Sequence, residues 1–350
     1  MAKIDIISGF LGAGKTTLIK KLLQDALKGQ QVVLIENEFG EIGIDGGFLK
    51  DAGIEIREMN SGCICCSLVG DFGTALREVI ESWHPDRIVI EPSGVGKLSD
   101  VIHAVENLHM DDAVLNSAVT VVDVLKCKMY LKNFGEFFKN QVQAAGTIIL
   151  SRTDTPKAVP EKVEAAIALL RGLNPDATII TTPVERLGGK KVMETIEGVK
   201  IDLSHVEDDH ENDHENDHEH EQDHEHAHHH EHEHDHEHAH HHDHDHEHAH
   251  HHHHHHADEV FTSWGRETVR KYSRDEIERI LQELSDEGAY GVILRAKGML
   301  ESPDGGWTYF DMVPEEIELR DGSAEYTGRI CVIGSKLNEA GLEKLWFPEA

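Results

Sequence analysis

The sequence predicts an α/β fold with a doubly wound, mostly parallel sheet, followed by a disordered histidine-rich linker and a small α+β domain. Short runs rich in valine and isoleucine alternate with helical patterns over the first part of the chain, as they do in βαβ units. Residues 205–256 then hold 27 of the 30 histidines and almost no apolar side chain. Globular patterning resumes afterwards. We therefore expect domains at 1–200 and 258–350, joined by a linker at 201–257.

The first domain is expected to be built from strands separated by helices. Several of the apolar runs are almost unbroken valine and isoleucine, which is typical of parallel strands buried on both faces. The expected strands are 3–8, 31–36, 54–59, 87–91, 118–123, 146–151 and 177–182. Helical patterns at 15–29 and 160–173 lie between strands. This alternation predicts the doubly wound sheet.

The histidine-rich stretch and the domain after it are predicted from composition and periodicity. The stretch has too few apolar side chains to offset the entropy of ordering a chain, so we expect it to be disordered. The second domain should contain helices at 274–284 and 338–347 and strands at 291–300, 306–313 and 329–334. These elements predict a small α+β domain.

The composition narrows the class of protein. The formal net charge of the 350 residues is −33, and residues 207–247 carry 18 Asp and Glu with no Lys or Arg. This charge argues against nucleic acid or an anionic membrane surface as a partner. The first residues lack the features of a signal peptide. The chain has no run of 18 consecutive apolar residues, so we expect no membrane span. With only five cysteines, we expect a cytoplasmic protein.

The segment GFLGAGKT, from Gly9 to Thr16, fits the pattern G-x-x-x-x-G-K-[ST]. It follows a predicted strand and opens a predicted helix, the context of a phosphate-binding P-loop. Backbone N–H groups and the helix N-terminus would then face phosphate oxygens. We expect Lys15 to reach the β- and γ-phosphates, Thr16 to bind Mg²⁺ and Thr17 to approach the α-phosphate. The expected nucleotide-binding residues are Gly9, Gly12, Ala13, Gly14, Lys15, Thr16 and Thr17. The alternative is a glycine-rich turn without function.

Two later strand ends supply the other parts of a nucleotide site. In EPSG, Glu91 ends an apolar strand and Gly94 follows three positions later, the D-x-x-G arrangement of GTPases with glutamate for aspartate. We expect Lys15, Glu91 and Gly94 to take part in catalysis. The alternative is that Glu91 is only a solvated glutamate at a strand end.

In LSRTD, Asp154 can accept two hydrogen bonds from guanine that adenine cannot donate, and the stem of Arg152 can lie along the base.

Several motifs in this order resemble the CobW-like GTPases, a family of P-loop metallochaperones. They are GFLGAGKTT, IENEFGEIGID, GCICC and EPSG, followed by FTSWGRET and LRAKG after the linker. The family includes zinc-transferase GTPases, the cobalamin-biosynthesis protein CobW and nitrile hydratase activators. The resemblance implies a switch I at 36–41, a switch II at 91–94 and GTP as the nucleotide. One departure is that the guanine motif [NT]-K-x-D is Ser-Arg-Thr-Asp at 151–154.

Three cysteines fall within four positions, between the two implied switch segments: Cys63, Cys65 and Cys66. Thiolates close together in a glycine-flanked loop suit Zn²⁺ or Co²⁺, and the resemblance makes these three the metal-binding cysteines. A further ligand is expected from Glu36, Glu38 or Glu41, or from a partner. Buried structural thiols and a redox dithiol are the alternatives, and redox is disfavoured because the motif is not C-x-x-C at a helix start.

The remaining thiols and imidazoles are interpreted differently. Cys127 and Cys331 stand alone in apolar surroundings and are expected in the core. The histidine tract can capture metal, because imidazole is mostly neutral at pH 7, although an incidental low-complexity expansion is the alternative.

The resulting hypothesis is a GTP-hydrolysing metallochaperone that uses GTP and Mg²⁺ and transfers Zn²⁺ or Co²⁺ to a client metalloprotein. A passive zinc or nickel store and a nickel-insertion GTPase are the alternatives. Self-association into a homodimer is a further expectation, because related P-loop metal GTPases often self-associate.

Overall fold

The computed structural model describes residues 1–37, 55–59, 69–204, 206, 260–285 and 288–348 of the chain. Residues 1–206 and 255–350 together form one compact unit, to which all described residues belong. The expected linker at 201–257 lies mostly outside the described residues. Its disorder and the three domain boundaries therefore stay predictions.

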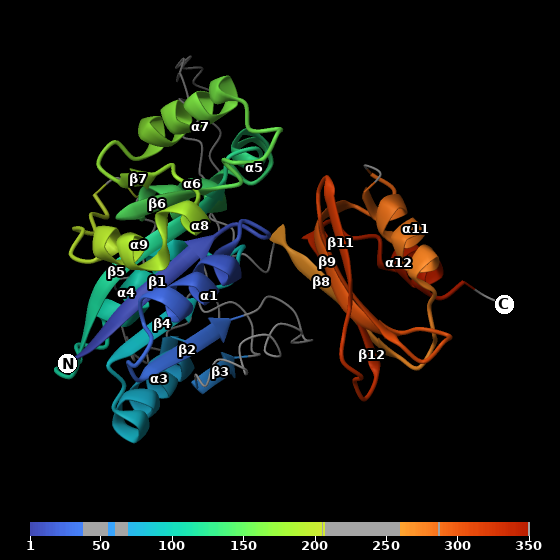
Figure 1. The fold of residues 1–350 in the computed structure, drawn as a ribbon, viewed down its shortest axis with the longest axis horizontal. Helices are drawn as coiled ribbons and strands as arrows, with labels where there is room; N and C mark the ends of the chain where they lie inside the picture. Colours follow the sequence, from blue (N-terminus) through green and yellow to red (C-terminus); the bar gives the residue numbers. More distant parts are fainter. Residues whose placement is uncertain (38–54, 60–68, 205, 207–259, 286–287, 349–350) are drawn as a thin grey trace, which may run out of the picture. The chain divides into compact units, whose positions relative to one another are not determined.

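Within the described residues, the first sheet has seven parallel strands in the order β3-β2-β4-β1-β5-β6-β7 (Figure 1). The strands are β1 (Ala2–Gly9), β2 (Val32–Asn37), β3 (Glu55–Met59), β4 (Arg87–Glu91), β5 (Ala113–Asp123), β6 (Thr147–Ser151) and β7 (Thr178–Ile180). The predicted strands are confirmed, although β5 begins at Ala113 rather than at 118, and β7 is limited to Thr178–Ile180 instead of 177–182. The chain passes from β4 across β1 to β5. The loop after β1 therefore lies where the strand order reverses, the place where open α/β sheets bind ligands.

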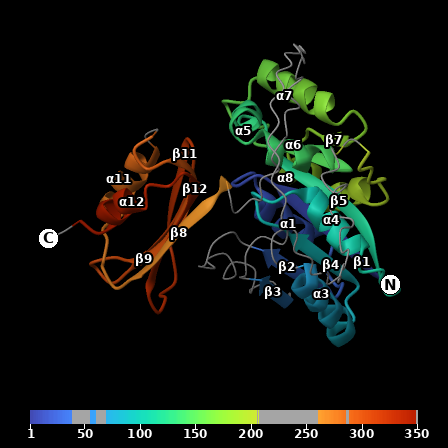
Figure 2. The same cartoon turned by 180° about the vertical axis from the view of Figure 1, so that it is seen from behind.

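Helices cover both faces of this sheet. They are α1 (Lys15–Asp25), α3 (Val69–Trp83), α4 (Leu98–Glu106), α5 (Cys127–Asn133), α6 (Gly135–Gln143), α7 (Pro160–Leu173), α8 (Val184–Leu187) and α9 (Gly189–Ile196). Ile7 of β1 shares a core with α1 and α9, which lie over the face seen in Figure 1. Ile4 and Ile6 share the opposite core with α3 and α4, seen in Figure 2. Successive strand residues thus point to opposite layers, and the predicted doubly wound fold is confirmed.

The first helix is shorter than predicted. A helix was expected at 15–29, but α1 ends at Asp25. The N–H groups of Ala26 and Leu27 both donate to the carbonyl of Leu22, so the regular spacing of four residues is lost. Gly29 then adopts a left-handed φ of +90°, which ends any continuation. The helix predicted at 160–173 is confirmed as α7.

The second domain contains a five-stranded antiparallel sheet in the order β11-β10-β9-β12-β8. Its elements are β8 (Thr262–Thr268), α11 (Arg274–Ser285), β9 (Val292–Glu301), β10 (Trp307–Val313), β11 (Glu316–Asp321), β12 (Gly328–Ser335) and α12 (Glu339–Trp346). Both helices bury apolar side chains against this sheet, with Leu281 and Trp346 fully enclosed. The predicted α+β domain is confirmed, and β8 and β11 are additions to it.

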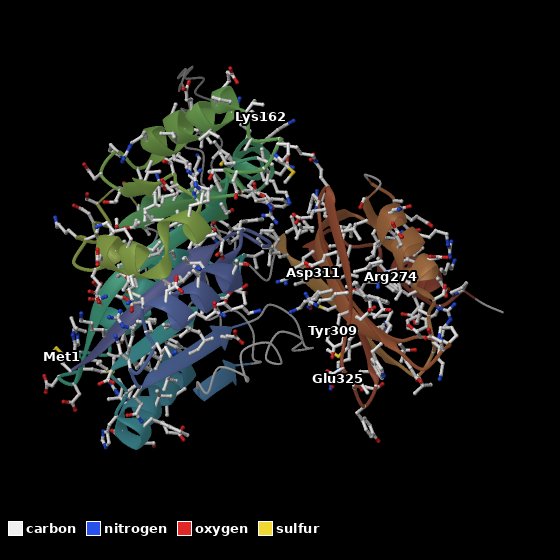
Figure 3. The ribbon with its side chains drawn as sticks, in the orientation of Figure 1. Met1, Lys162, Arg274, Tyr309, Asp311 and Glu325 are labelled. Atoms are coloured by element: carbon white, nitrogen blue, oxygen red, sulfur yellow. The ribbon has the colours of Figure 1, made fainter. Side chains whose placement is uncertain are left out.

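Side-chain hydrogen bonds join residues of the second sheet to one another and to the loop after β11. Arg295 of β9 donates to both carboxylate oxygens of Asp311 on β10, at 3.0 and 2.7 Å. Tyr309, also on β10, donates to Glu325 at 3.1 Å. Asp311, Tyr309 and Glu325 are labelled in Figure 3. Two-point arginine–carboxylate pairing of this kind fixes orientation as well as adding energy.

Candidate functional site

The segment between β1 and α1 folds as a phosphate-binding loop requires. Gly12 and Gly14 adopt left-handed φ angles of +69° and +101°, which residues with a Cβ rarely adopt. Gly14 caps the N-terminus of α1, so the positive end of the helix dipole lies at the loop. The loop closes on itself through the N–H of Ala13, which donates to the carbonyl of Phe10 at 3.1 Å.

Two consecutive residues that open α1, Lys15 and Thr16, meet the distant residue Glu91 beside this loop. Lys15 is buried, and its Nζ donates to the carbonyl of Gly9 at 3.1 Å and lies 3.9 Å from Glu91 Oε1. The Thr16 hydroxyl donates to Glu91 Oε1 at 3.2 Å. The end of β4 therefore brings a carboxylate to the start of α1. This outcome contradicts the alternative of a solvated strand-end glutamate.

The chemistry of this donor set fits Mg²⁺. Thr16 and Glu91 offer a hydroxyl and a carboxylate, the hard oxygen donors that Mg²⁺ prefers. Glu36, one residue before the end of β2, is the register partner of Glu91 and is also buried. Among the described residues, no group of three or more His, Cys, Asp or Glu could hold a metal ion. The predicted ligands Cys63, Cys65, Cys66 and Glu41 lie outside the described residues, as does Glu38.

Gly94 lies directly against the phosphate loop. A Cβ placed on Gly94 would be 2.9 Å from the backbone nitrogen of Leu11 and 3.1 Å from its Cα. The side chain of Gln141 on α6, fully buried, donates to the carbonyls of Gly94 and Gly96 at 3.2 and 2.8 Å. The sequence analysis missed Gln141. Its only signal was its spacing, because Gln141 follows Phe137 and Phe138 by four and three residues and so lies on the same buried face of α6.

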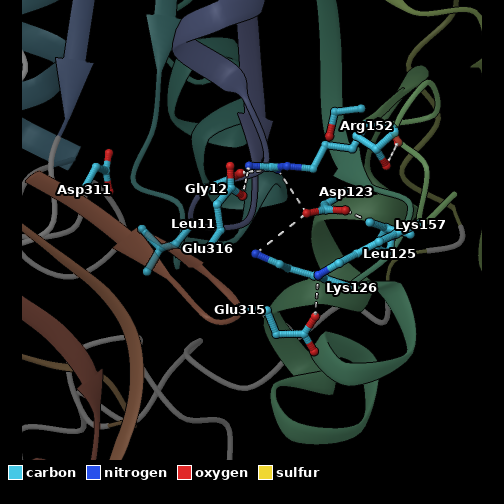
Figure 4. Close-up of polar contacts among 12 residues, drawn as sticks. Leu11, Gly12, Asp123, Leu125, Lys126, Arg152, Lys157, Asp311, Glu315 and Glu316 are labelled. Carbon is cyan, nitrogen blue, oxygen red and sulfur yellow. Dashed lines mark hydrogen bonds and ion pairs between the residues drawn. The ribbon is translucent and has the colours of Figure 1, made fainter. Parts of the chain in front are cut away.

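The segment after β6 places its arginine on the phosphate loop (Figure 4). Arg152 has a left-handed φ of +58°, and its Nη1 donates to the carbonyl of Gly12 at 2.8 Å and to Asp123 Oδ2 at 3.0 Å. Asp154, predicted to bind guanine, is exposed beside it. The predicted contact of the Arg152 stem with a base stays a prediction, since what is seen is its guanidinium holding the loop.

Asp123 was missed by the sequence analysis although it ends a predicted strand. It is buried, and besides Arg152 it accepts the backbone N–H of Leu125 at 2.9 Å. Lys126 Nζ lies 3.8 Å from the same carboxylate, and burial lowers the pKa of this lysine. The rule that identified Glu91, a carboxylate at the carboxyl end of an apolar strand, also identifies Asp123.

The two isolated cysteines are core residues, as predicted. Cys127 and Cys331 are both buried. Burial raises the pKa of Cys127 to about 12, so its thiol stays protonated at physiological pH. No helix in the described part of the chain is long and apolar enough to cross a membrane.

Comparison with known proteins places both domains. Residues 3–181 match the family described as CobW/HypB/UreG, nucleotide-binding domain, and residues 261–347 match the Cobalamin synthesis protein cobW C-terminal domain. The chain is 36% identical over 178 residues to a zinc chaperone CobW of Sinorhizobium sp, covering 43% of this chain and 50% of that protein. It is 31% identical over 166 residues to the zinc chaperone YeiR of Escherichia coli, covering 47% and 50%.

A third relative comes from a eukaryote. The zinc-regulated GTPase metalloprotein activator 1 of Dictyostelium discoideum is 25% identical over 234 residues, covering 55% of this chain and 48% of that protein. The chain thus spans about half the length of the curated relatives it matches. With the loop, Thr16, Glu91 and Gly94 in place, the chain belongs to the CobW/HypB/UreG family of nucleotide-binding domains, followed here by a cobW C-terminal domain.

Proposed function

We propose that this chain is a GTP-hydrolysing metallochaperone that carries a divalent metal, Zn²⁺ or Co²⁺, to a client metalloprotein. GTP binding is supported by one observation. Lys15, Thr16 and Glu91 meet beside a loop against which Gly94 packs. The proposed transport of a divalent metal rests on the spacing of the three cysteines and on relatives named as zinc chaperones and as a zinc-regulated GTPase.

This geometry supports the following nucleotide chemistry. Lys15, now donating to the loop carbonyl of Gly9, turns to the β- and γ-phosphates when GTP is bound. Thr16 and Glu91 would hold Mg²⁺, which would supply positive charge to offset that of the phosphate groups. Gly94 offers its backbone N–H to the γ-phosphate, held in place by Gln141. Asp154 selects guanine through the N1–H and N2–H₂ donors.

Coupling to the metal cargo follows from the order of segments along the chain. Cys63, Cys65 and Cys66 lie between residues 36–45 and 91–94, the two segments expected to respond to the γ-phosphate. Glu36, one residue before the end of β2, pairs in register with Glu91, so a proposed cargo ligand and a nucleotide-side carboxylate are neighbours across one strand pair. Binding of GTP is expected to alter the cysteine site, and hydrolysis to release the metal.

The test is a chelator-competition titration of Zn²⁺ in the protein lacking residues 207–254. These residues fall outside the compact unit formed by the rest of the chain. The titration is run with a non-hydrolysable GTP analogue and then with GDP. We expect one tight site whose affinity differs between the two nucleotides. Replacing Cys63, Cys65 and Cys66 with Ser should remove the site, and Lys15→Ala should remove the difference but keep the site.

The second candidate function is a passive metal store, favoured by the 27 histidines of residues 205–256. It predicts equal Zn²⁺ affinity with either nucleotide, and loss of most bound metal when the tract is deleted. Equal affinities in the titration above would therefore reject the chaperone and support the store.

A further inference from the structure

The hairpin formed by β10 and β11 contacts the phosphate loop. Val313, the last residue of β10, packs on Gly12, because a Cβ placed on that glycine would lie 2.5 Å from Val313 Cγ1. Phe261, just before β8, meets Phe10 of the same loop with ring centroids 6.3 Å apart. Two separate segments of the C-terminal domain thus contact the nucleotide-binding loop.

A charged contact joins the same hairpin to the guanine-side arginine. Glu316, the first residue of β11, accepts a hydrogen bond from Arg152 Nη2 at 2.5 Å. The other terminal nitrogen of this guanidinium, Nη1, donates hydrogen bonds to the Gly12 carbonyl and to Asp123. Figure 4 shows Arg152 reaching Gly12, with Asp123 and Glu316 on either side of it. One planar group therefore links the loop, the end of β5 and the hairpin.

The charges around this arginine alternate in sign. The hairpin supplies Glu315 and Glu316, and Lys157 Nζ lies 3.7 Å from Glu315. Lys126 Nζ is buried near Asp123 and has no hydrogen-bond partner among the described residues. The hairpin thus brings two carboxylates to a cluster that holds three cations, which favours its docking there.

The backbone conformation of Arg152 indicates that neighbouring residues hold this arginine in place. A non-glycine residue at a φ of +58° is strained and keeps that conformation only when its surroundings fix it. The Gly12 carbonyl and Asp123 fix one guanidinium nitrogen, and Glu316 fixes the other. An arginine held at both nitrogens has one orientation, whereas one held at a single nitrogen can swing.

We propose that Glu316 is a positioning residue for nucleotide binding, acting through Arg152. This inference rests on the proposed function, in which the phosphate loop binds GTP and Arg152 lies on its guanine side. Because Glu316 belongs to the C-terminal domain, the linkage is reciprocal. Whatever draws the hairpin away from Arg152 lowers nucleotide affinity, and bound nucleotide strengthens hairpin docking.

The experiment measures GDP, GTP-analogue and ATP binding, with kcat and KM for GTP, in the full chain with Mg²⁺. We expect Glu316→Gln to raise the Kd for GDP and the KM for GTP about threefold to fivefold, the range of a half-exposed ion pair, with kcat within twofold. Glu316→Asp should restore part of the loss. The matched control is Glu318→Gln, which removes a carboxylate that pairs with Arg320 on the same strand.

A double-mutant cycle tests whether the effect passes through Arg152. In an Arg152→Met background, which keeps the side-chain stem, Glu316→Gln should have no further effect. Additive effects, or a Glu316→Gln variant that binds GDP as tightly as Glu318→Gln, would overturn the proposal. Tighter binding would overturn it as well, because the glutamate would then oppose the nucleotide. Failure of the unmodified chain to bind GTP would instead refute the proposed function.

Discussion

At the scale of single residues, Gly94 leaves no room for a side chain unless the backbone around it shifts. A Cβ there would lie 2.9 Å from the backbone of Leu11, so either the phosphate loop or the loop after β4 must shift. We expect Gly94→Ala to weaken binding of a GTP analogue by about tenfold or more, because a hydrogen bond to a charged group is displaced. GDP, which has no γ-phosphate, should lose less.

The matched control for that measurement is Gly172→Ala in α7. A Cβ on Gly172 meets nothing within 4 Å, and alanine favours helix over glycine by about 1 kcal/mol. Its nucleotide affinities should equal those of the unmodified chain. Equal loss of GDP and GTP-analogue affinity in Gly94→Ala would argue against a γ-phosphate contact at this position.

The cysteines divide into two classes that alkylation can separate. Burial raises the pKa of Cys127 to about 12, and Cys331 is buried too, so neither should react with iodoacetamide at pH 8 in the folded protein. We expect mass spectrometry to find label only on Cys63, Cys65 and Cys66. Zn²⁺ should protect these three, and unfolding in guanidinium should expose all five. Native labelling of Cys127 would contradict the burial described for it.

At this scale, the sequence predicted which residues meet where their positions follow from a motif, while their roles in nucleotide binding and catalysis stay predictions. Lys15, Thr16 and Glu91 each sit at a fixed place in a motif or at a strand end, and the structure brings them together. Glu316 could not be predicted in this way. Its partner Arg152 lies 164 residues away, and only the packing of two domains brings them into contact.

At the scale of elements, periodicity predicted the buried strands but missed two edge strands. β8 and β11 are the two outer strands of the second sheet. Edge strands carry charged and polar side chains that block further pairing, as Glu316, Glu318 and Arg320 do on β11. Their sequences therefore lack the apolar signal on which strand prediction depends.

One buried ion-pair network ties several elements of the first domain. Arg87 at the start of β4 pairs with Asp5 of β1 and with Glu197, which follows α9. Removing one partner of a buried pair leaves an uncompensated charge, so Arg87→Met should lower the free energy of unfolding by about 3–5 kcal/mol. Lys3→Met is the control. Lys3 pairs with the same Glu197 from a half-exposed position, so this substitution should lower the free energy of unfolding by about 1 kcal/mol or less.

The same network predicts a pH dependence. Burial opposes ionisation of Glu197, but hydrogen bonds from Arg87 and Lys3 outweigh it, so the pKa of Glu197 lies below its ordinary value of 4.5. A lowered pKa stabilises the fold above pH 4.5, and this contribution is lost as the pH falls through the folded value. The difference in the free energy of urea unfolding between the unmodified chain and Arg87→Met should therefore narrow as the pH falls from neutral to below 4.5. A constant difference across this range would exclude Glu197 as the cause.

At the scale of the whole molecule, the histidine tract and the folded unit should act independently. Deleting residues 207–254 leaves both folded domains, which form a compact unit without that segment. We expect the deletion to remove most of the weak Zn²⁺ capacity seen by equilibrium dialysis. The melting temperature, the kcat for GTP and the tight site seen in chelator competition should be unchanged, because none of the residues proposed for them lies in the tract.

A full-length control can separate imidazole from carboxylate binding. Every histidine from 210 to 254 is replaced by glutamine, while the 18 acidic residues stay. If imidazoles hold the metal, this variant should match the deletion, and the capacity of the unmodified chain should fall between pH 7.5 and 5.5 as imidazole with a pKa of about 6.5 is protonated. Capacity retained after replacement would assign the metal to the carboxylates. Loss of the tight site in either variant would mean that the tract supplies a ligand to it, and the two parts could then not be treated as independent.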